Sequence, residues 1–159
     1  MKAIYPIVIH KFEDSSPHWF ATKYSLTECY WVRFESEIIS GSAILFPCGN
    51  GIEELRSRPS PQSIVAETGV KAYEDFRLLA DTETYAERSE PLPNPGDYEL
   101  TGRVWRVMTD EDGEIFSVKV FIGSLDFDLN KSDLAGIDVE EGAWVRFRVL
   151  ELALYDANY

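Results

Sequence analysis

Two cysteines and two histidines are the residues of this sequence from which nucleophilic or metal chemistry would most readily be built. Cys48 follows a predicted strand and precedes a segment that could begin a helix, where backbone N–H groups lower the pKa of a thiol. A phosphatase-type loop also requires an arginine six positions after the cysteine, but that position holds Glu54. We therefore predict no catalytic residues, and a Cys48-dependent hydrolase ranks last among three candidate functions.

Metal and cofactor sites have equally little support in the sequence. The residues that most often bind zinc are irregularly spaced and include no close pair: His10, His18, Cys29 and Cys48. The acidic run at residues 110–114 lacks the twelve-residue order of a calcium loop, and a hairpin turn explains it better. We predict no metal and no cofactor, and we expect the two cysteines to be reduced thiols of a cytosolic protein.

Aromatic and basic side chains gather on one face of the predicted C-terminal strands. Single-stranded nucleic acids stack on aromatic rings and pair with basic groups, so this face is a predicted binding site. In the simpler interpretation, the N-terminal half covers the aromatic rings, and Asp126 and Asp128 pair with the basic groups across strands. The predicted binding residues are Arg103, Trp105, Lys119, Phe121, Trp144, Arg146 and Arg148.

The elements that must position this face lie within residues 97–159. Two runs of strand-forming residues, 98–108 and 114–122, flank Asp112-Gly113, which favours a tight hairpin. Strand alternation then predicts the core side of the second run. The predicted core residues on that side are Phe116, Val118, Val120 and Ile122.

A third strand is predicted at residues 125–129, a single helical turn at 130–137, and a last strand at 143–154 with Val145, Phe147 and Val149 facing inward. This order of strands, hairpin, bend and helical turn resembles the oligonucleotide/oligosaccharide-binding barrel. The resemblance covers about a third of the chain and implies a small closed barrel.

The N-terminal part is also predicted to be rich in strands. Strands are expected at residues 5–10 and 27–39, with a turn at residues 40–42 leading back into 43–46. Apolar residues at helical spacing predict one helix over residues 70–80. The expected fold is α+β but mostly β, with an N-terminal sheet region and one helix (1–88), a Pro-rich connection (89–96) and the small barrel (97–159), which could pack together as one domain.

The charge of the chain is strongly and unevenly negative. The net charge is −13; residues 1–50 hold four basic and five acidic residues, whereas 51–159 hold eleven and twenty-three. Such a field repels a nucleic-acid backbone and attracts a basic partner. No apolar run approaches the roughly twenty residues of a membrane span, and the start of the chain is typical of a strand, so we expect a cytoplasmic protein that enters no membrane.

We therefore predict a non-enzymatic protein-binding module, for example a bacterial immunity or inhibitor protein that acts on a basic partner. The alternative from a different class is a nucleic-acid-binding barrel that uses Trp105, Phe121 and Trp144. The charge disfavours the alternative, because affinity for nucleic acid depends on neutralising phosphates. The sequence does not indicate an oligomeric state.

Overall fold

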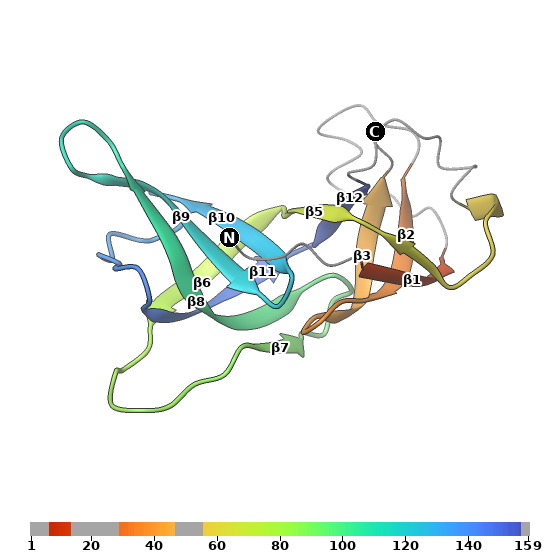
Figure 1. Ribbon diagram of the computed structural model, residues 1–159, viewed down its shortest axis with the longest axis horizontal. Helices are drawn as coiled ribbons and strands as arrows, with labels where there is room; N and C mark the ends of the chain where they lie inside the picture. The colour runs from red at the N-terminus through yellow and green to blue at the C-terminus, as the bar shows by residue number, and fades with distance from the viewer. Residues whose placement is uncertain (1–6, 14–28, 47–55, 157–159) are drawn as a thin grey trace.

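A computed structural model describes residues 7–13, 29–46 and 56–156, which form two curled β-sheets (Figure 1). The first sheet has the order β4-β1-β2-β3-β12-β5. Its strands are β1 (Ile7–Phe12), β2 (Tyr30–Glu35), β3 (Ser40–Phe46), β4 (Gln62–Ile64), β5 (Ala66–Gly69) and β12 (Ala153–Asp156). The mostly β fold predicted from the sequence is confirmed.

The second sheet has the order β10-β9-β8-β11-β6, and β7 pairs with β8 outside this path. Its strands are β6 (Ala72–Leu78), β7 (Arg88–Pro91), β8 (Tyr98–Thr109), β9 (Ile115–Ile122), β10 (Leu125–Asn130) and β11 (Trp144–Leu150). The pairing of the described strands runs from β10 to β6 without returning to β10, so the expected closed barrel is not shown. Each sheet takes a strand from the far side of residues 89–96, β12 in the first and β6 in the second. A division into two domains there stays a prediction.

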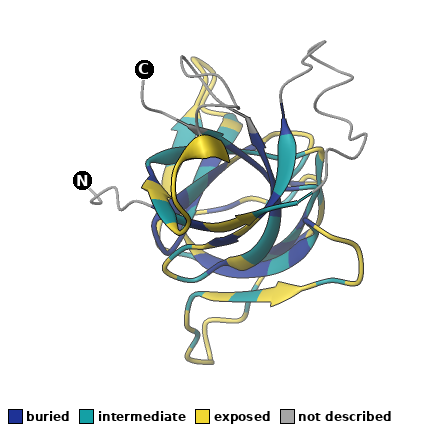
Figure 2. Cartoon of the chain, turned by 90° about the vertical axis from the view of Figure 1, so that its right-hand side faces the viewer, coloured by how far each residue is buried: buried dark blue, intermediate teal, exposed yellow. Residues whose placement is uncertain are grey.

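One hydrophobic core joins the two sheets. A single cluster of buried residues includes Ile7 and Leu45 of the first sheet together with Phe127 and Phe147 of the second. Figure 2 shows how the buried and exposed parts of the chain are distributed over the two curled sheets. Because strand side chains alternate, regular strands such as β10 and β11 contribute every second residue to this shared interior. In the first sheet, the alternate residues Cys29, Ile44 and Ala153 form a separate, smaller buried cluster.

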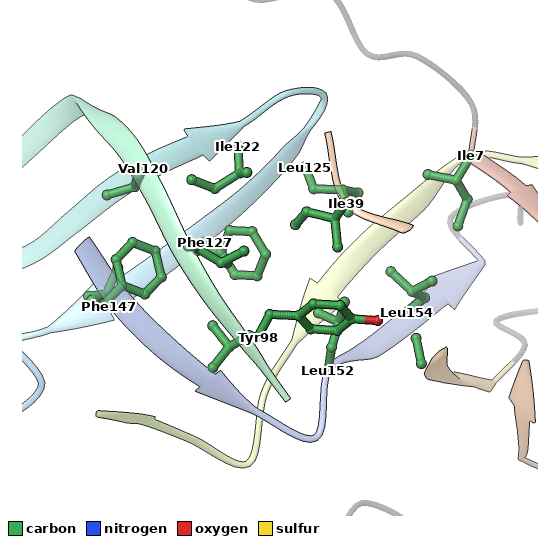
Figure 3. Packing of buried hydrophobic residues seen from close by; sticks show 14 of the residues in the cluster. Ile7, Ile39, Tyr98, Val120, Ile122, Leu125, Phe127, Phe147, Leu152 and Leu154 are labelled. Atoms are coloured by element: carbon green, nitrogen blue, oxygen red, sulfur yellow. The ribbon is translucent and has the colours of Figure 1, made fainter. Parts of the chain in front are cut away.

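Tyr98 connects the sheets within this core. Its ring is 2% exposed and reaches from β8 toward Leu152 and Leu154 (Figure 3). Its hydroxyl donates a hydrogen bond of 2.7 Å to the backbone oxygen of Ser42 in β3. The close approach requires glycine at position 41, where φ is +142° and a Cβ atom would lie 2.6 Å from the Tyr98 hydroxyl oxygen.

The helix predicted over residues 70–80 is wrong, because these residues form β6 and pair with β11. In the described chain, helical conformation is confined to Arg56 and Ser57. An irregularity in the pairing leaves an extra residue in β6, and Asp75 there has a φ of +53°. Such a bulge shifts the alternation by one residue and brings Tyr73 and Phe76 to the same side, where both rings contact Phe147. Because of the bulge, Tyr73 and Phe76 lie three residues apart on the same side of a strand, which is the spacing also expected on one face of a helix.

The two shorter turns also differ from expectation. The chain reverses at residues 36–39, where the Ser36 amide donates a hydrogen bond to the Ile39 carbonyl and the Ile39 amide donates one to the Ser36 hydroxyl oxygen. Residues 40–42 already belong to β3. Residues 131–136 form consecutive turns rather than a helical turn. Asp133 closes the first of these turns by accepting a hydrogen bond from the Asn130 amide. Short polar side chains favour such turns because they replace backbone acceptors.

The hairpin between β8 and β9 is confirmed, with Gly113 at a φ of +78°. Its core side is confirmed for Val118, Val120 and Ile122, which are fully buried, but is wrong for Phe116, which is 48% exposed. The end of the hairpin projects beyond the body of the second sheet, at the left of Figure 1. An irregularity in the pairing between Met108 and Thr109 leaves Phe116 as an extra residue of β9, so the alternation shifts there and Ile115 packs against the core instead.

Candidate functional site

The predicted aromatic and basic residues lie on the outer face of the second sheet. Register places Arg103 of β8 between Trp144 of β11 and Phe121 of β9. A pairing irregularity between Val104 and Arg106 makes Trp105 an extra residue of β8, and Trp105 is 38% exposed. The sheet thus brings together the predicted tryptophans and their basic neighbours, while their role in binding stays a prediction.

The aromatic rings on this face make contacts within the protein. The Trp105 ring packs edge-to-face on Phe121, with ring centres 5.3 Å apart, and the Arg106 guanidinium lies 4.6 Å from the Trp105 ring centre. Trp144 is half-buried and lies 6.0 Å from the ring of Tyr85, which follows β6 in the chain. Trp105 is therefore the most accessible of the three predicted aromatic residues.

Of the predicted basic groups on the same face, Lys119, Arg146 and Arg148 have carboxylate partners, whereas Arg103 donates a hydrogen bond of 3.2 Å to the Gly142 carbonyl. The Lys119 Nζ lies 3.3 Å from a carboxylate oxygen of Asp126 and 3.7 Å from one of Asp128, as the simpler interpretation of the sequence expected. Arg148 lies 3.6 Å from Asp75 across the β6–β11 pair. These ion pairs remove most of the positive potential that a phosphate backbone would require.

Glu99 is the centre of the largest ion-pair cluster on this face. Its carboxylate, on a side chain that is 18% exposed, lies 2.7 Å from Arg77, 3.9 Å from Arg146 and 3.7 Å from Arg148. Arg146 also donates a hydrogen bond of 3.0 Å to the Thr101 hydroxyl. A cavity of only about 100 Å³ lies beside the cluster, so the arginines serve mainly to hold β6, β8 and β11 together.

A different site lies at the end of the second sheet where the β8–β9 hairpin projects. A groove of about 460 Å³ runs between residues 78–81, at the end of β6 and just after it, and residues 138–144, which lead into the first residue of β11. The two walls are joined by a hydrogen bond of 2.9 Å from the Leu79 amide to the Trp144 carbonyl. The lining combines apolar and acidic residues: Leu78, Leu79, Ala80, Asp81, Asp138, Glu140, Glu141, Gly142, Ala143 and Trp144.

A second hollow, of about 540 Å³, continues the groove toward the hairpin. Asp138 and Glu140 line both hollows, and the second also includes Glu114 and Lys131. The hairpin tip adds three more exposed carboxylates beside Glu114. We call this surface the acidic end; its carboxylates, all exposed, are Asp81, Asp110, Glu111, Asp112, Glu114, Asp138, Glu140 and Glu141.

Few cations balance the acidic end. Lys131 pairs with Glu114 at 2.8 Å, and this contact raises the pKa of the lysine. The four groove carboxylates make no ion pair with any residue in the described ranges: Asp81, Asp138, Glu140 and Glu141. The sequence did not reveal the groove, because residues 78–80 fell within the predicted helix. The sequence feature that pointed to an acidic surface was the excess of acidic over basic residues after position 50.

The residues considered for chemistry contribute no described site. Burial raises the pKa of the Cys29 thiol, which disfavours the nucleophilic thiolate. Cys48 and His18 lie outside the described residues. Within the described ranges, no three His, Cys, Asp or Glu residues gather closely enough to hold a metal ion. The same ranges contain no helix of the length and apolarity that crossing a membrane requires.

Comparison with known proteins provides no further assignment. No protein-family model, curated protein or solved structure matches this chain. The site must therefore be interpreted from its own chemistry.

Proposed function

We propose that this protein is a cytoplasmic, non-enzymatic interaction module that binds a basic protein partner, as a bacterial immunity or inhibitor protein does. The observation that carries the proposal is the acidic end, where eight exposed carboxylates are accompanied by Lys131 and by the Arg103 guanidinium, which donates a hydrogen bond to the Gly142 carbonyl of the groove wall. Like charges so close together repel one another, and a basic partner that approaches them relieves this repulsion. Complementary charge also accelerates association and disfavours acidic competitors.

The charge pattern supports this surface over the sheet face as the place of binding. On the sheet face, Lys119, Arg146 and Arg148 already have carboxylate partners in the protein. A ligand there would have to replace existing ion pairs, whereas a basic ligand at the acidic end would form new ones. New ion pairs at an otherwise unbalanced surface are the more favourable exchange.

The proposal can be tested by affinity capture from a lysate of the native host. Each captured protein is then purified and titrated against this protein by calorimetry at several salt concentrations. We expect a basic protein that forms a stoichiometric complex, with an affinity that falls steeply as salt rises above about 0.1 M. A partner of neutral or acidic charge, or an affinity independent of salt, would contradict the proposal. Cell fractionation would test the cytoplasmic location.

The second candidate is a nucleic-acid-binding barrel, favoured by one observation, the exposed Trp105 ring with Arg106 stacked on it. We propose that the second sheet then corresponds to a small closed barrel of the oligonucleotide/oligosaccharide-binding type, in which β10 approaches the β6 edge. Its support is the strand order together with the curl of the sheet.

Fluorescence anisotropy with labelled single-stranded oligonucleotides at about 0.1 M salt separates the two candidates. We expect no saturable signal at micromolar protein, because the net charge of −13 repels phosphates. Saturable binding that Trp105→Ala and Trp144→Ala both abolish would reverse the order of the candidates. Arg58→Ala, which changes an exposed residue away from this face, is the control.

A further inference from the structure

We propose that the groove between residues 78–81 and 138–144 is the docking site for one segment of the basic partner, in which lysine or arginine alternates with large apolar side chains. This inference rests on the proposed function and specifies its site and ligand chemistry. It follows from two properties of the groove, an exposed apolar lining and carboxylates without cations.

The apolar part of the groove is exposed where the sheet ends. Leu78 is the last residue of β6 and is 44% exposed, and Leu79 and Trp144 are half-buried beside it. Three large apolar side chains are exposed in the described residues, Leu78, Trp105 and Phe116, and Leu78 lines this groove. Apolar surface that remains exposed at a concave site gains free energy when a ligand covers it.

The acidic part of the groove determines the charge of that ligand. Asp81 stands on one wall, and Asp138, Glu140 and Glu141 stand on the other. Elsewhere on the second sheet, carboxylates such as Glu99 and Asp126 have arginine or lysine partners, whereas these four have none among the described residues. A membrane surface or nucleic acid would bring further negative charge, so charge complementarity selects a cationic polypeptide.

The geometry of the walls suits an extended segment. The Leu79–Trp144 hydrogen bond joins the two lining segments of the groove, and the second hollow shares Asp138 and Glu140 with it and continues toward the hairpin. Successive side chains of an extended segment point to opposite sides, so basic and apolar residues in alternation reach different parts of the lining. A compact cation such as free lysine would contact the carboxylates only.

The probe is a fluorescein-labelled synthetic peptide in which lysine alternates with leucine, titrated by anisotropy at about 0.05 M salt. Two matched peptides replace leucine by serine or lysine by glutamate. We expect the lysine–leucine peptide to bind about tenfold more tightly than the lysine–serine peptide, and the glutamate–leucine peptide not to bind. Equal binding of the lysine–leucine and lysine–serine peptides would contradict the groove as the docking site and would leave the proposed charge-driven function unaffected.

Matched variants localise the binding. The double variant Asp81→Asn with Glu140→Gln removes two groove charges, and Glu111→Gln with Asp112→Asn removes two at the hairpin tip. We expect about tenfold weaker binding for the groove variant and less than about twofold for the tip variant. Equal weakening would show a general charge effect, which contradicts the groove but agrees with the proposed function.

The apolar contact has its own pair of variants. Leu78→Thr and Phe116→Thr each replace an exposed apolar residue at a strand position, inside and outside the groove respectively. We expect only Leu78→Thr to weaken binding of the lysine–leucine peptide, about fivefold. An unchanged affinity, or no binding of any lysine peptide, would overturn the groove. The proposed function would then depend on the capture experiment alone.

Discussion

Phe147 organises the aromatic part of the core. Its ring centre lies 5.8 Å from that of Tyr73, 6.4 Å from Phe76 and 6.1 Å from Phe127. We expect Phe147→Ala to lower the free energy of unfolding by about 3–5 kcal/mol, through lost burial and the cavity it leaves. Phe116→Ala removes a ring that is 48% exposed and should cost less than about 1 kcal/mol. Urea denaturation measures both, and equal losses would contradict the strand facing described here.

Ionisation of the buried Tyr98 hydroxyl lowers the free energy of unfolding at alkaline pH. Burial raises the pKa of its hydroxyl from 10.0 to about 12, so the folded protein retains this proton where the unfolded chain has lost it. The stability that depends on the neutral Tyr98 hydroxyl is therefore fully present below about pH 10. It is lost as the pH rises from about 10 to about 12, and the total loss is about 2–3 kcal/mol.

We expect the free energy of unfolding to fall less steeply above pH 10 in Tyr98→Phe than in the wild type, as measured by urea titration at successive pH values. At neutral pH the variant should be less stable by about 1 kcal/mol, because the Ser42 carbonyl loses its donor. The pKa of Tyr73 is also raised by burial, and this residue remains in both proteins, so the difference isolates Tyr98. Parallel pH profiles would refute this assignment.

Glu99 differs from the other surface carboxylates in the number of cations that surround it. Glu99→Gln leaves Arg77, Arg146 and Arg148 without their shared anion, and we expect a loss of about 1–2 kcal/mol that decreases as salt rises. Glu90→Gln breaks a single exposed pair with Arg88 and should cost under about 0.5 kcal/mol. Thermal denaturation of the two variants at low and high salt tests this expectation. Equal losses of stability in both variants would show that the Glu99 cluster stabilises the protein no more than a single exposed ion pair does.

Among the elements, β6 provides the sharpest test of the fold. Asp75 adopts a left-handed conformation with a φ of +53°, which glycine tolerates and alanine does not. We expect Asp75→Gly to be about 1 kcal/mol more stable than Asp75→Ala, although both lose the contact with Arg148. In a helix the order would be reversed, since alanine exceeds glycine there by about 1 kcal/mol. Comparing their urea denaturation midpoints therefore decides between strand and helix.

The elements also show which features a sequence can predict. Strict alternation correctly predicted the buried sides of β10 and β11, because a regular strand repeats every two residues. Alternation failed at β6 and at Phe116 of β9, because in both places a bulge adds a residue and shifts the facing of its neighbours. The outward facing of Trp105 and Arg103 followed from the pattern, but their ion-pair and stacking partners depended on register between distant strands. The groove combines two segments separated by nearly sixty residues, and no local pattern connects them.

At the scale of the molecule, the two sheets share one core. Ile9 and Leu154 of the first sheet belong to the same buried cluster as Val120 and Phe147 of the second. We expect a single cooperative thermal transition, with equal calorimetric and van't Hoff enthalpies. Leu154→Ala and Val120→Ala should lower the same midpoint, and two separate transitions would instead indicate that residues 1–88 and 97–159 fold independently.

The position of β12 has a consequence for synthesis of the chain on the ribosome. β3 pairs in parallel with β12, so Ile44 must wait for Ala153 to emerge before this side of the strand can pair. Until then, β3 presents unpaired backbone groups beside an apolar surface, a combination that promotes association between nascent chains. Contacts so distant in sequence also slow folding. The protein would therefore depend on the protection of its early strands, by the ribosome surface or a chaperone, until residues 153–156 are available.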